Sequence, residues 1–134
     1  MGLKQEVDFL VQTPTIVDGS VTANWNSGVA TSGLAGADLF SIGRAGQWYL
    51  LNQGCVLVAG FNVAATITIR EYGWVMGAER LLYTDTYTFA DDIVFFSIWL
   101  DMEMYGIYRV EIHSDQATDD GLTVPYEYRI KDWV

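Results

Sequence analysis

The sequence contains one cysteine, one histidine and two prolines in 134 residues. With Cys55 alone, the chain can form neither an internal disulfide nor a cysteine-based metal cluster, which excludes a disulfide-stapled secreted scaffold. The same scarcity of His and Cys argues against a zinc site. Cys55 opens the apolar run CVLVAGF without a basic residue nearby in the sequence. We therefore expect a buried and inert thiol.

Long apolar stretches are also missing. The first residues, MGLKQEVDFLVQTPT, lack the apolar core of a signal peptide. The longest apolar runs, such as residues 93–100, are far too short to cross a bilayer. From these absences we expect a soluble protein made in the cytoplasm, with no signal peptide and no transmembrane segment.

Basic residues are few, and only two of them are lysines. Seventeen acidic residues against seven basic ones give a formal charge of −10, and thirteen of the acids fall in residues 61–134. A field of this sign repels nucleic acid phosphates and anionic lipid. We therefore expect no nucleic acid partner and no membrane partner. The charge keeps the protein soluble and could steer it toward a basic surface.

Helical periodicity is nearly absent, and alternating or β-branched runs between Gly, Asn and Asp recur instead. They predict an all-β fold, an antiparallel β-sandwich of jelly-roll type with about 8–9 strands, although an up-and-down barrel stays open. A chain of this length buries enough surface to form a core without a staple. The predicted strands are Val7–Val11, Val21–Trp25, Gln47–Leu51, Cys55–Phe61, Ala65–Val75, Arg80–Thr84, Ile93–Trp99, Ile107–His113 and Thr123–Lys131.

The domain prediction rests on residues 26–37, NSGVATSGLAGA, whose small and polar composition is typical of a flexible loop. Residues 1–25 would then be an N-terminal arm or the first strands, and residues 38–134 the sandwich body. A long loop inside one domain explains the composition equally well. In either case we expect one domain overall.

A register can be predicted if residues 107–113 pair antiparallel with residues 123–131. One register sets Arg109 opposite Glu127, and a slip of two residues sets Arg109 opposite Arg129. Opposite charges across a strand pair stabilise it and like charges destabilise it, so we expect the first register. Pro125 has no N–H, so its strand should lie at a sheet edge or be interrupted there.

No group of residues indicates catalysis. His113, Ser114 and Asp115 have the residue types of a triad, but consecutive positions at a strand end cannot converge as a triad requires. Asp101 and Glu103 would share one strand face, and paired carboxylates can hydrolyse glycosides, yet a solvated face is the simpler interpretation. The glycines match no phosphate-binding pattern. We expect no enzyme activity and no cofactor.

Asp115, Asp119 and Asp120 form the single metal candidate. Carboxylates clustered in the loop SDQATDDG could hold calcium with backbone carbonyls. Their spacing does not match an EF-hand, and Asp120-Gly121 supplies ordinary turn chemistry. We expect a solvated acidic turn and assign no metal site, with calcium as the weaker alternative.

Aromatic residues are the strongest sign of a binding surface. The five tryptophans are Trp25, Trp48, Trp74, Trp99 and Trp133, and most fall on predicted strands. Strand alternation puts Trp48 and Tyr49 on opposite faces, so one of them should meet solvent or a partner. Exposed aromatics on a sandwich stack on sugars or anchor protein contacts.

Three stretches within residues 65–133 carry a family resemblance: ATITIREYGWVMGAE, YRVEIHSDQATDDG and VPYEYRIKDW. This second half of the chain resembles small β-sandwich proteins encoded among the structural genes of tailed bacteriophages. It implies a non-enzymatic part of the virion, such as a capsid decoration (cement) protein or another head, neck or tail accessory protein. It brings no catalytic residues.

The same resemblance sets the expected partners and location. We expect self-association, as a trimer or at a local symmetry axis, and binding to other capsid or tail proteins in the virion. The alternative, motivated by the aromatics, is a carbohydrate-binding β-sandwich module or adhesin.

Overall fold

The computed structural model describes residues 15–88 and 95–132, with the side chains of 95–102 and 132 left out. It contains eight strands and one short 3-10 helix in an all-β fold. Their bounds are β1 Thr15–Asn24, β2 Ala37–Ile42, β3 Trp48–Leu57, β4 Thr66–Val75, β5 Ala78–Thr88, β6 Phe95–Tyr105, β7 Tyr108–Ser114, η1 Ala117–Asp119 and β8 Asp120–Asp132.

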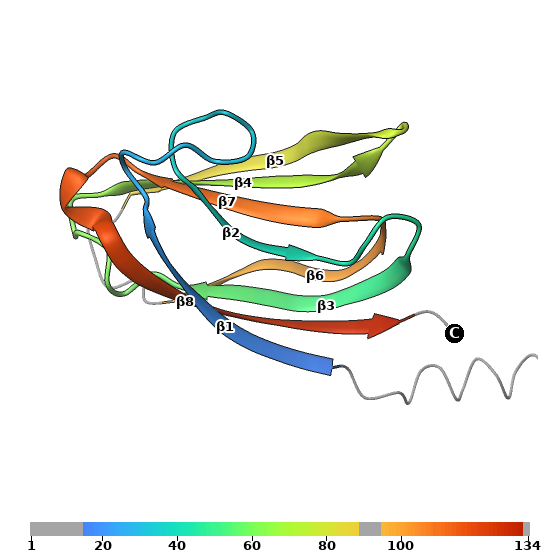
Figure 1. Ribbon diagram of the computed structural model, residues 1–134. Helices are drawn as coiled ribbons and strands as arrows, with labels where there is room; N and C mark the ends of the chain where they lie inside the picture. Colours follow the sequence, from blue (N-terminus) through green and yellow to red (C-terminus); the bar gives the residue numbers. More distant parts are fainter. Residues whose placement is uncertain (1–14, 89–94, 133–134) are drawn as a thin grey trace, which may run out of the picture.

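The strands form two four-stranded antiparallel sheets that pack face to face (Figure 1). One sheet has the order β1-β8-β3-β6 and the other the order β2-β7-β4-β5. Chain neighbours such as β1 and β2 lie in different sheets, and the last strand returns beside the first. This order is that of a jelly roll. The predicted β-sandwich is therefore confirmed.

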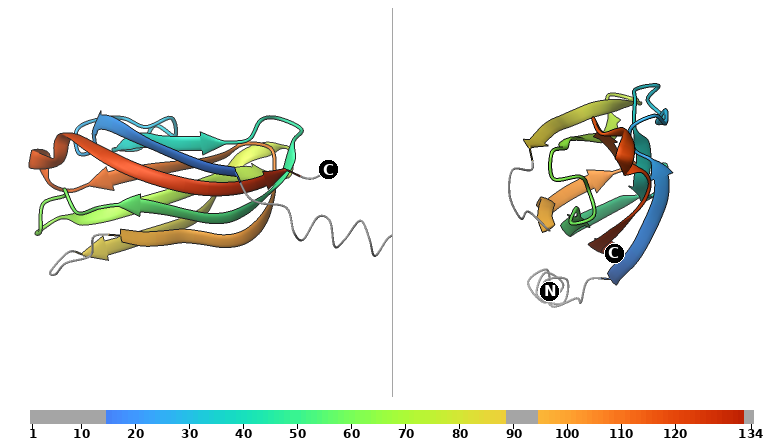
Figure 2. Two further views of the ribbon diagram at one scale, coloured as in Figure 1. Left: turned by 90° about the horizontal axis from the view of Figure 1, so that it is seen from below. Right: turned by 90° about the vertical axis from the view of Figure 1, so that its left-hand side faces the viewer.

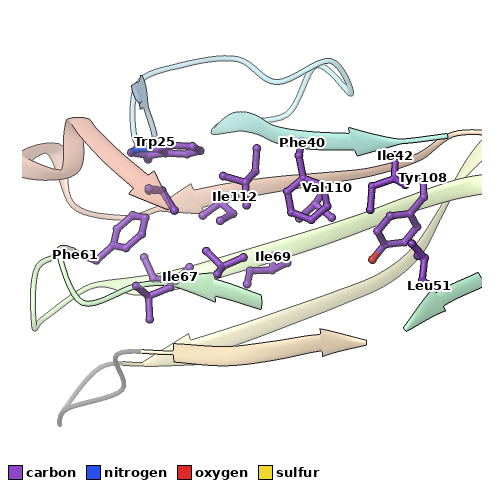
Figure 3. Packing of buried hydrophobic residues seen from close by; sticks show 14 of the residues in the cluster. Trp25, Phe40, Ile42, Leu51, Phe61, Ile67, Ile69, Tyr108, Val110 and Ile112 are labelled. Atoms are coloured by element: carbon purple, nitrogen blue, oxygen red, sulfur yellow. The ribbon is translucent and has the colours of Figure 1, made fainter. Parts of the chain in front are cut away.

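The core lies between the inner faces of the two sheets, because alternate residues of each strand point inward. On β7, Tyr108, Val110 and Ile112 are fully buried, and on β4 so are Ile67 and Ile69. Figure 3 shows these side chains filling the space between the sheets, with Trp25 and Phe61 closing one end. The Trp25 indole also donates a hydrogen bond to the Leu122 carbonyl (2.8 Å).

The strand prediction needs correction in two places. β2 was missed by the sequence patterns, because its six residues follow directly on the glycine-rich segment. Residues 47–51 and 55–61, predicted as two strands, mostly belong to the single strand β3, whose ladder is irregular between Leu51 and Gln53 and between Gly54 and Cys55. The predicted strand Val7–Val11 lies outside the described residues.

The predicted pairing of residues 107–113 with residues 123–131 is wrong. β7 pairs with β2 and β4, whereas β8 pairs with β1 and β3 in the other sheet. The chain crosses between the sheets through η1, so Arg109 lies opposite neither Glu127 nor Arg129. Arg109 is instead paired with Ser41 on β2 and Tyr72 on β4.

Pro125 sits where the missing N–H does least harm. β8 lies inside its sheet, but its ladder with β3 extends only from Tyr126 to Asp132. At Pro125 the strand therefore has one neighbour, Ser20 on β1. This is a local edge, as expected for proline.

Residues 25–36 connect β1 to β2 across the outer face of the second sheet. The loop is anchored near its start, where the amides of Asn26 and Ser27 bond to Asp120 Oδ1 (2.8 and 3.1 Å). In the middle, the Ser32 hydroxyl bonds to Glu111 Oε1 (2.7 Å). The body predicted from residue 38 also includes β1, which pairs with β8 along its whole length. The flexibility of the loop stays a prediction.

Candidate functional site

Trp48 and Tyr49 begin β3 and point to opposite sides of the sheet, as the alternation predicted. Tyr49 is fully buried, and its hydroxyl donates to the Gly106 carbonyl (2.6 Å) and the Ile42 carbonyl (3.1 Å). Burial raises the pKa of Tyr49 well above its ordinary value. Trp48 is 53% exposed. One of the two aromatics therefore does meet solvent, which confirms the prediction.

Trp48 lies beside a second exposed aromatic residue. The last residue of β6, Tyr105, is the backbone partner of Trp48, and their ring centroids are 4.7 Å apart with the rings tilted by 44°. Tyr105 is also exposed. The pair forms a small aromatic platform where the two strands end.

Gly106 joins this platform to the neighbouring hairpin. Its amide donates to the Gln47 carbonyl (2.8 Å), and a Cβ at this position would lie 2.9 Å from Trp74 Cβ. Gly106 also has a φ of 79°, which glycine tolerates. The close approach brings Trp74, at the end of β4, next to the β6–β7 turn.

The tip of the β4–β5 hairpin extends the apolar surface. Met76 and Gly77 form a two-residue turn between Val75 and Ala78, with φ values of 53° and 78°. Positive φ at both central residues is the requirement of a type I′ turn, where Asn-Gly or Asp-Gly is preferred. Met76 instead presents a side chain that is 88% exposed.

These side chains are gathered at one end of the sandwich, which we call the aromatic end. It lies where β2, β4 and β6 end and where β3, β5 and β7 begin, at the right-hand side of Figure 1. Figure 2 (left) shows the three turns of this end together. Its members are exposed and apolar or aromatic: Trp48, Trp74, Val75, Met76, Tyr105 and Ile107.

Basic residues surround the aromatic end. Arg44 lies exposed in the β2–β3 connection, Arg80 lies exposed near the start of β5, and Lys131 comes near the end of β8. Arg80 Nε donates to the Val75 carbonyl (2.9 Å), which holds this guanidinium beside the hairpin tip. No ion pair among the side chains that the structure describes involves these three residues. Two exposed carboxylates among the described side chains lie nearby, Glu103 in β6 and Glu79 in β5, and Glu79 is bound to Arg109.

The three aspartates of the calcium hypothesis lie at the opposite end, around η1, and each serves a different loop. Asp115 Oδ1 accepts the Thr66 amide (2.8 Å), and Asp120 Oδ1 accepts the two amides of the β1–β2 loop described above. Asp119 is buried and binds the Asn62 amide (2.9 Å) and the Ser114 hydroxyl (2.6 Å). Across the described part of the chain, no three His, Cys, Asp or Glu side chains are grouped to hold a metal ion.

The side chains of Ser114 and Asp115 do not converge on a shared site either. Ser114 donates its hydroxyl to Asp119, whereas Asp115 is exposed and bound to Thr66. His113 is half-buried at its strand end. Glu103 is exposed, while the side chain of Asp101 lies outside the described residues.

Cys55 is buried, as expected, and its thiol donates to the Glu127 carbonyl (3.4 Å). Burial, followed by the nearby charge of Glu127, raises the pKa of the thiol, so it stays protonated and unreactive. Cys55 lines a shallow groove of about 480 Å³ on the outer face of β1, β8 and β3, together with Gln53, Leu57 and Pro125. Asp18, Glu127 and Arg129 give this groove mixed charge.

The sequence patterns did not reveal an ionic network on the outer face of the second sheet. Glu111, fully buried, accepts bonds from Arg70 Nε (2.9 Å), Arg109 Nη1 and Ser32. Arg109 also contacts Asp38 (2.9 Å) and Glu79 (2.7 Å). Alternation along β4 and β7 could have predicted that Arg70, Arg109 and Glu111 share one face. It could not have predicted that the β1–β2 loop covers that face.

Further contacts show that this network is structural. The Arg109 guanidinium lies 4.4 Å from the centre of the Tyr72 ring, and Arg70 donates to the Ala35 carbonyl (2.8 Å). Burial alone would raise the pKa of Glu111, but the bonds from Arg109, Ser32 and Arg70 lower it below its ordinary value. Each charge thus has partners within the fold, and the network fastens the loop to the sheet.

No family model, no curated protein and no solved structure matches the chain. Within the described residues, no helix has the length and apolarity needed to cross a membrane.

Proposed function

We propose that this protein is a non-enzymatic binding protein that assembles with other proteins in a virus particle, as a capsid decoration or another head, neck or tail accessory protein. It docks through the aromatic end. The observation that carries the proposal is the exposure of Trp48, Trp74, Met76 and Tyr105 at the same end of the sandwich, because soluble monomers rarely expose several such groups close together without a partner.

The composition of the aromatic end favours a protein partner. Trp, Tyr, Met and Arg are enriched in protein interfaces, and Trp, Tyr and Arg dominate their binding energy. Trp48, Tyr105 and Arg44 provide these types on a frame of strand ends and short turns. The virion setting rests on the resemblance of residues 65–133 to phage sandwich proteins.

The experiment uses the proteins encoded by the genes on either side of this one, produced together so that any particle or tail among them assembles. Particles or tails assembled from them are mixed with the purified protein, and binding is measured by cosedimentation. We expect saturable binding that Trp48→Ala weakens at least tenfold. An exposed tyrosine on β5, changed in Tyr83→Phe, serves as the control that leaves binding intact. Absence of cosedimentation with every neighbouring structural protein would overturn the proposal.

A carbohydrate-binding module is the second candidate, because the exposed Trp48–Tyr105 platform offers a ring face for sugar stacking. It predicts a change in tryptophan fluorescence on titration with the bound glycan. A glycan array identifies the sugar, and Trp48→Ala should abolish the response. No response on the array removes this candidate.

A further inference from the structure

The turn of the β4–β5 hairpin breaks a local rule of stability. A type I′ turn is most stable with Asn or Asp before Gly, because these residues tolerate positive φ. Met76 occupies this position with a φ of 53° and leaves its side chain in water. Violations of this kind are expected at functional positions, where presentation of a side chain outweighs stability.

Charge is distributed unevenly along the long axis of the sandwich. Of the six described basic residues, Arg70 and Arg109 are buried in the ionic network, and the other four lie toward the aromatic end. At the opposite end, the described residues of the connections 25–36, 58–65 and 115–119 contain no Lys or Arg.

The opposite end of the sandwich, on the η1 side at the left of Figure 1, carries Asp115, Asp119 and Asp120. We call it the acidic end. Asp115 is exposed and Asp120 half-buried. The Thr66 amide lowers the pKa of Asp115, and the Ser27 hydroxyl and amide lower that of Asp120. These carboxylates are therefore ionised at neutral pH.

We infer that the aromatic end binds the acidic end of a second copy of this chain, with Met76 as an apolar anchor and Arg44, Arg80 and Lys131 facing the carboxylates of the neighbour. Charge complementarity identifies the occupant. Among the side chains that the structure describes, three cations at one end have no ion-pair partner, and the carboxylates at the other end have no cation beside them.

A contact between two different surfaces is heterologous, so it repeats head to tail. Repetition closes a ring when the rotation between copies allows it, and otherwise extends a row. A patch-to-patch dimer would instead bring the cations of two aromatic ends together. The inference rests on the proposed function, since the aromatic end is the docking surface in both: a second copy covers it in the free protein and competes there with the proteins of the particle.

Two double variants distinguish the head-to-tail contact from the patch-to-patch dimer. Met76→Asn with Arg44→Glu damages the aromatic end, and Asn suits the φ of the turn. Asp115→Asn with Asp120→Asn removes two charges from the acidic end and keeps an amide oxygen for the internal bonds. We expect Met76→Asn alone to raise the unfolding midpoint by about 3 °C.

Sedimentation velocity of the full chain then tests the contact. The wild type should associate with rising concentration, less strongly as salt screens the charges, and each double variant should need at least tenfold more protein. An equimolar mixture of the two variants should form a 1:1 complex that grows no further, because one intact contact remains.

Three outcomes overturn the inference: a wild type that stays monomeric, an acidic-end variant that associates like the wild type, or a mixture that forms no complex. Wild-type association that becomes stronger as the salt concentration rises would also contradict the head-to-tail contact. If cosedimentation with particles survives such a failure, the proposed function stands and only the head-to-tail contact falls.

Discussion

The hydroxyl of Tyr108 donates a hydrogen bond to Glu71 Oε1 between the two sheets, where both side chains are buried. Burial raises the pKa of Glu71 from 4.5 to about 7, against the opposing effect of the Tyr108 bond. The charge of Asp85 adds to the rise. The sandwich thus encloses a carboxyl group that folding makes harder to ionise.

Glu71 should make stability fall as the pH rises from 4.5 to 7. In this window the unfolded chain has lost the Glu71 proton while the folded chain retains it, so deprotonation favours unfolding. The full effect is on the order of 3 kcal/mol. Urea unfolding at several pH values should show this fall in the wild type and its loss in Glu71→Gln. Identical pH profiles for the two proteins would contradict the assignment.

Glu111 should be among the costliest carboxylates to replace. Glu111→Gln leaves the buried arginines Arg70 and Arg109 without a full counter-charge, and such a loss costs about 3–5 kcal/mol. The matched control is Glu127→Gln, whose partner Arg129 is 3.5 Å away and partly exposed, so the cost should stay below about 1 kcal/mol. Urea unfolding measures both. Equal costs would show that the network does not stabilise the fold.

Residues 28–36 should exchange their amide hydrogens slowly for a loop. The amides of Gly28, Ala30 and Gly36 donate to backbone carbonyls at 2.9–3.0 Å, and Ser32 is bound to Glu111. Ser32→Ala should speed exchange in this segment and leave the strands unchanged. If the wild-type loop exchanges as fast as an unstructured peptide, the flexible loop expected from composition is the better description.

Tyr49 should stabilise the turns that carry the aromatic end. Tyr49→Phe removes the donor to Ile42 and Gly106 and leaves two buried carbonyls short of a partner, at a cost of about 1–3 kcal/mol. The exposed Tyr83 provides the control, since Tyr83→Phe should change stability by less than about 0.5 kcal/mol. Thermal unfolding distinguishes the two. Equal midpoints would mean that the hydroxyl bonds contribute nothing.

Alternation in the sequence was sufficient to predict the fold class, because inward-facing positions such as Tyr108, Val110 and Ile112 follow a period of two. It also predicted the opposite faces of Trp48 and Tyr49. The polar segment at Asn52–Gly54 looked like a turn but lies inside β3, where backbone pairing on both sides outweighs local propensity.

Strand partners could not be predicted in the same way. The charges of Arg109 and Glu127 suited a hairpin, but Arg109 meets its acids from β2, β5 and β7 instead. The aromatic end likewise joins three turns distant in sequence, and only topology brings Trp74 to Gly106. Met76-Gly77 is the one local signal of this surface in the sequence, because Met stands before Gly between two predicted strands, where a hairpin turn prefers Asn or Asp.

Hydrogen exchange of the protein bound to assembled particles tests the central claim most directly, since it maps which surface is covered. Binding through the aromatic end predicts slower exchange at residues 74–78 and 104–107 than in the free protein. Unchanged exchange at both segments, with protection confined to the open edge of β1 or the groove beside Cys55, would contradict the account.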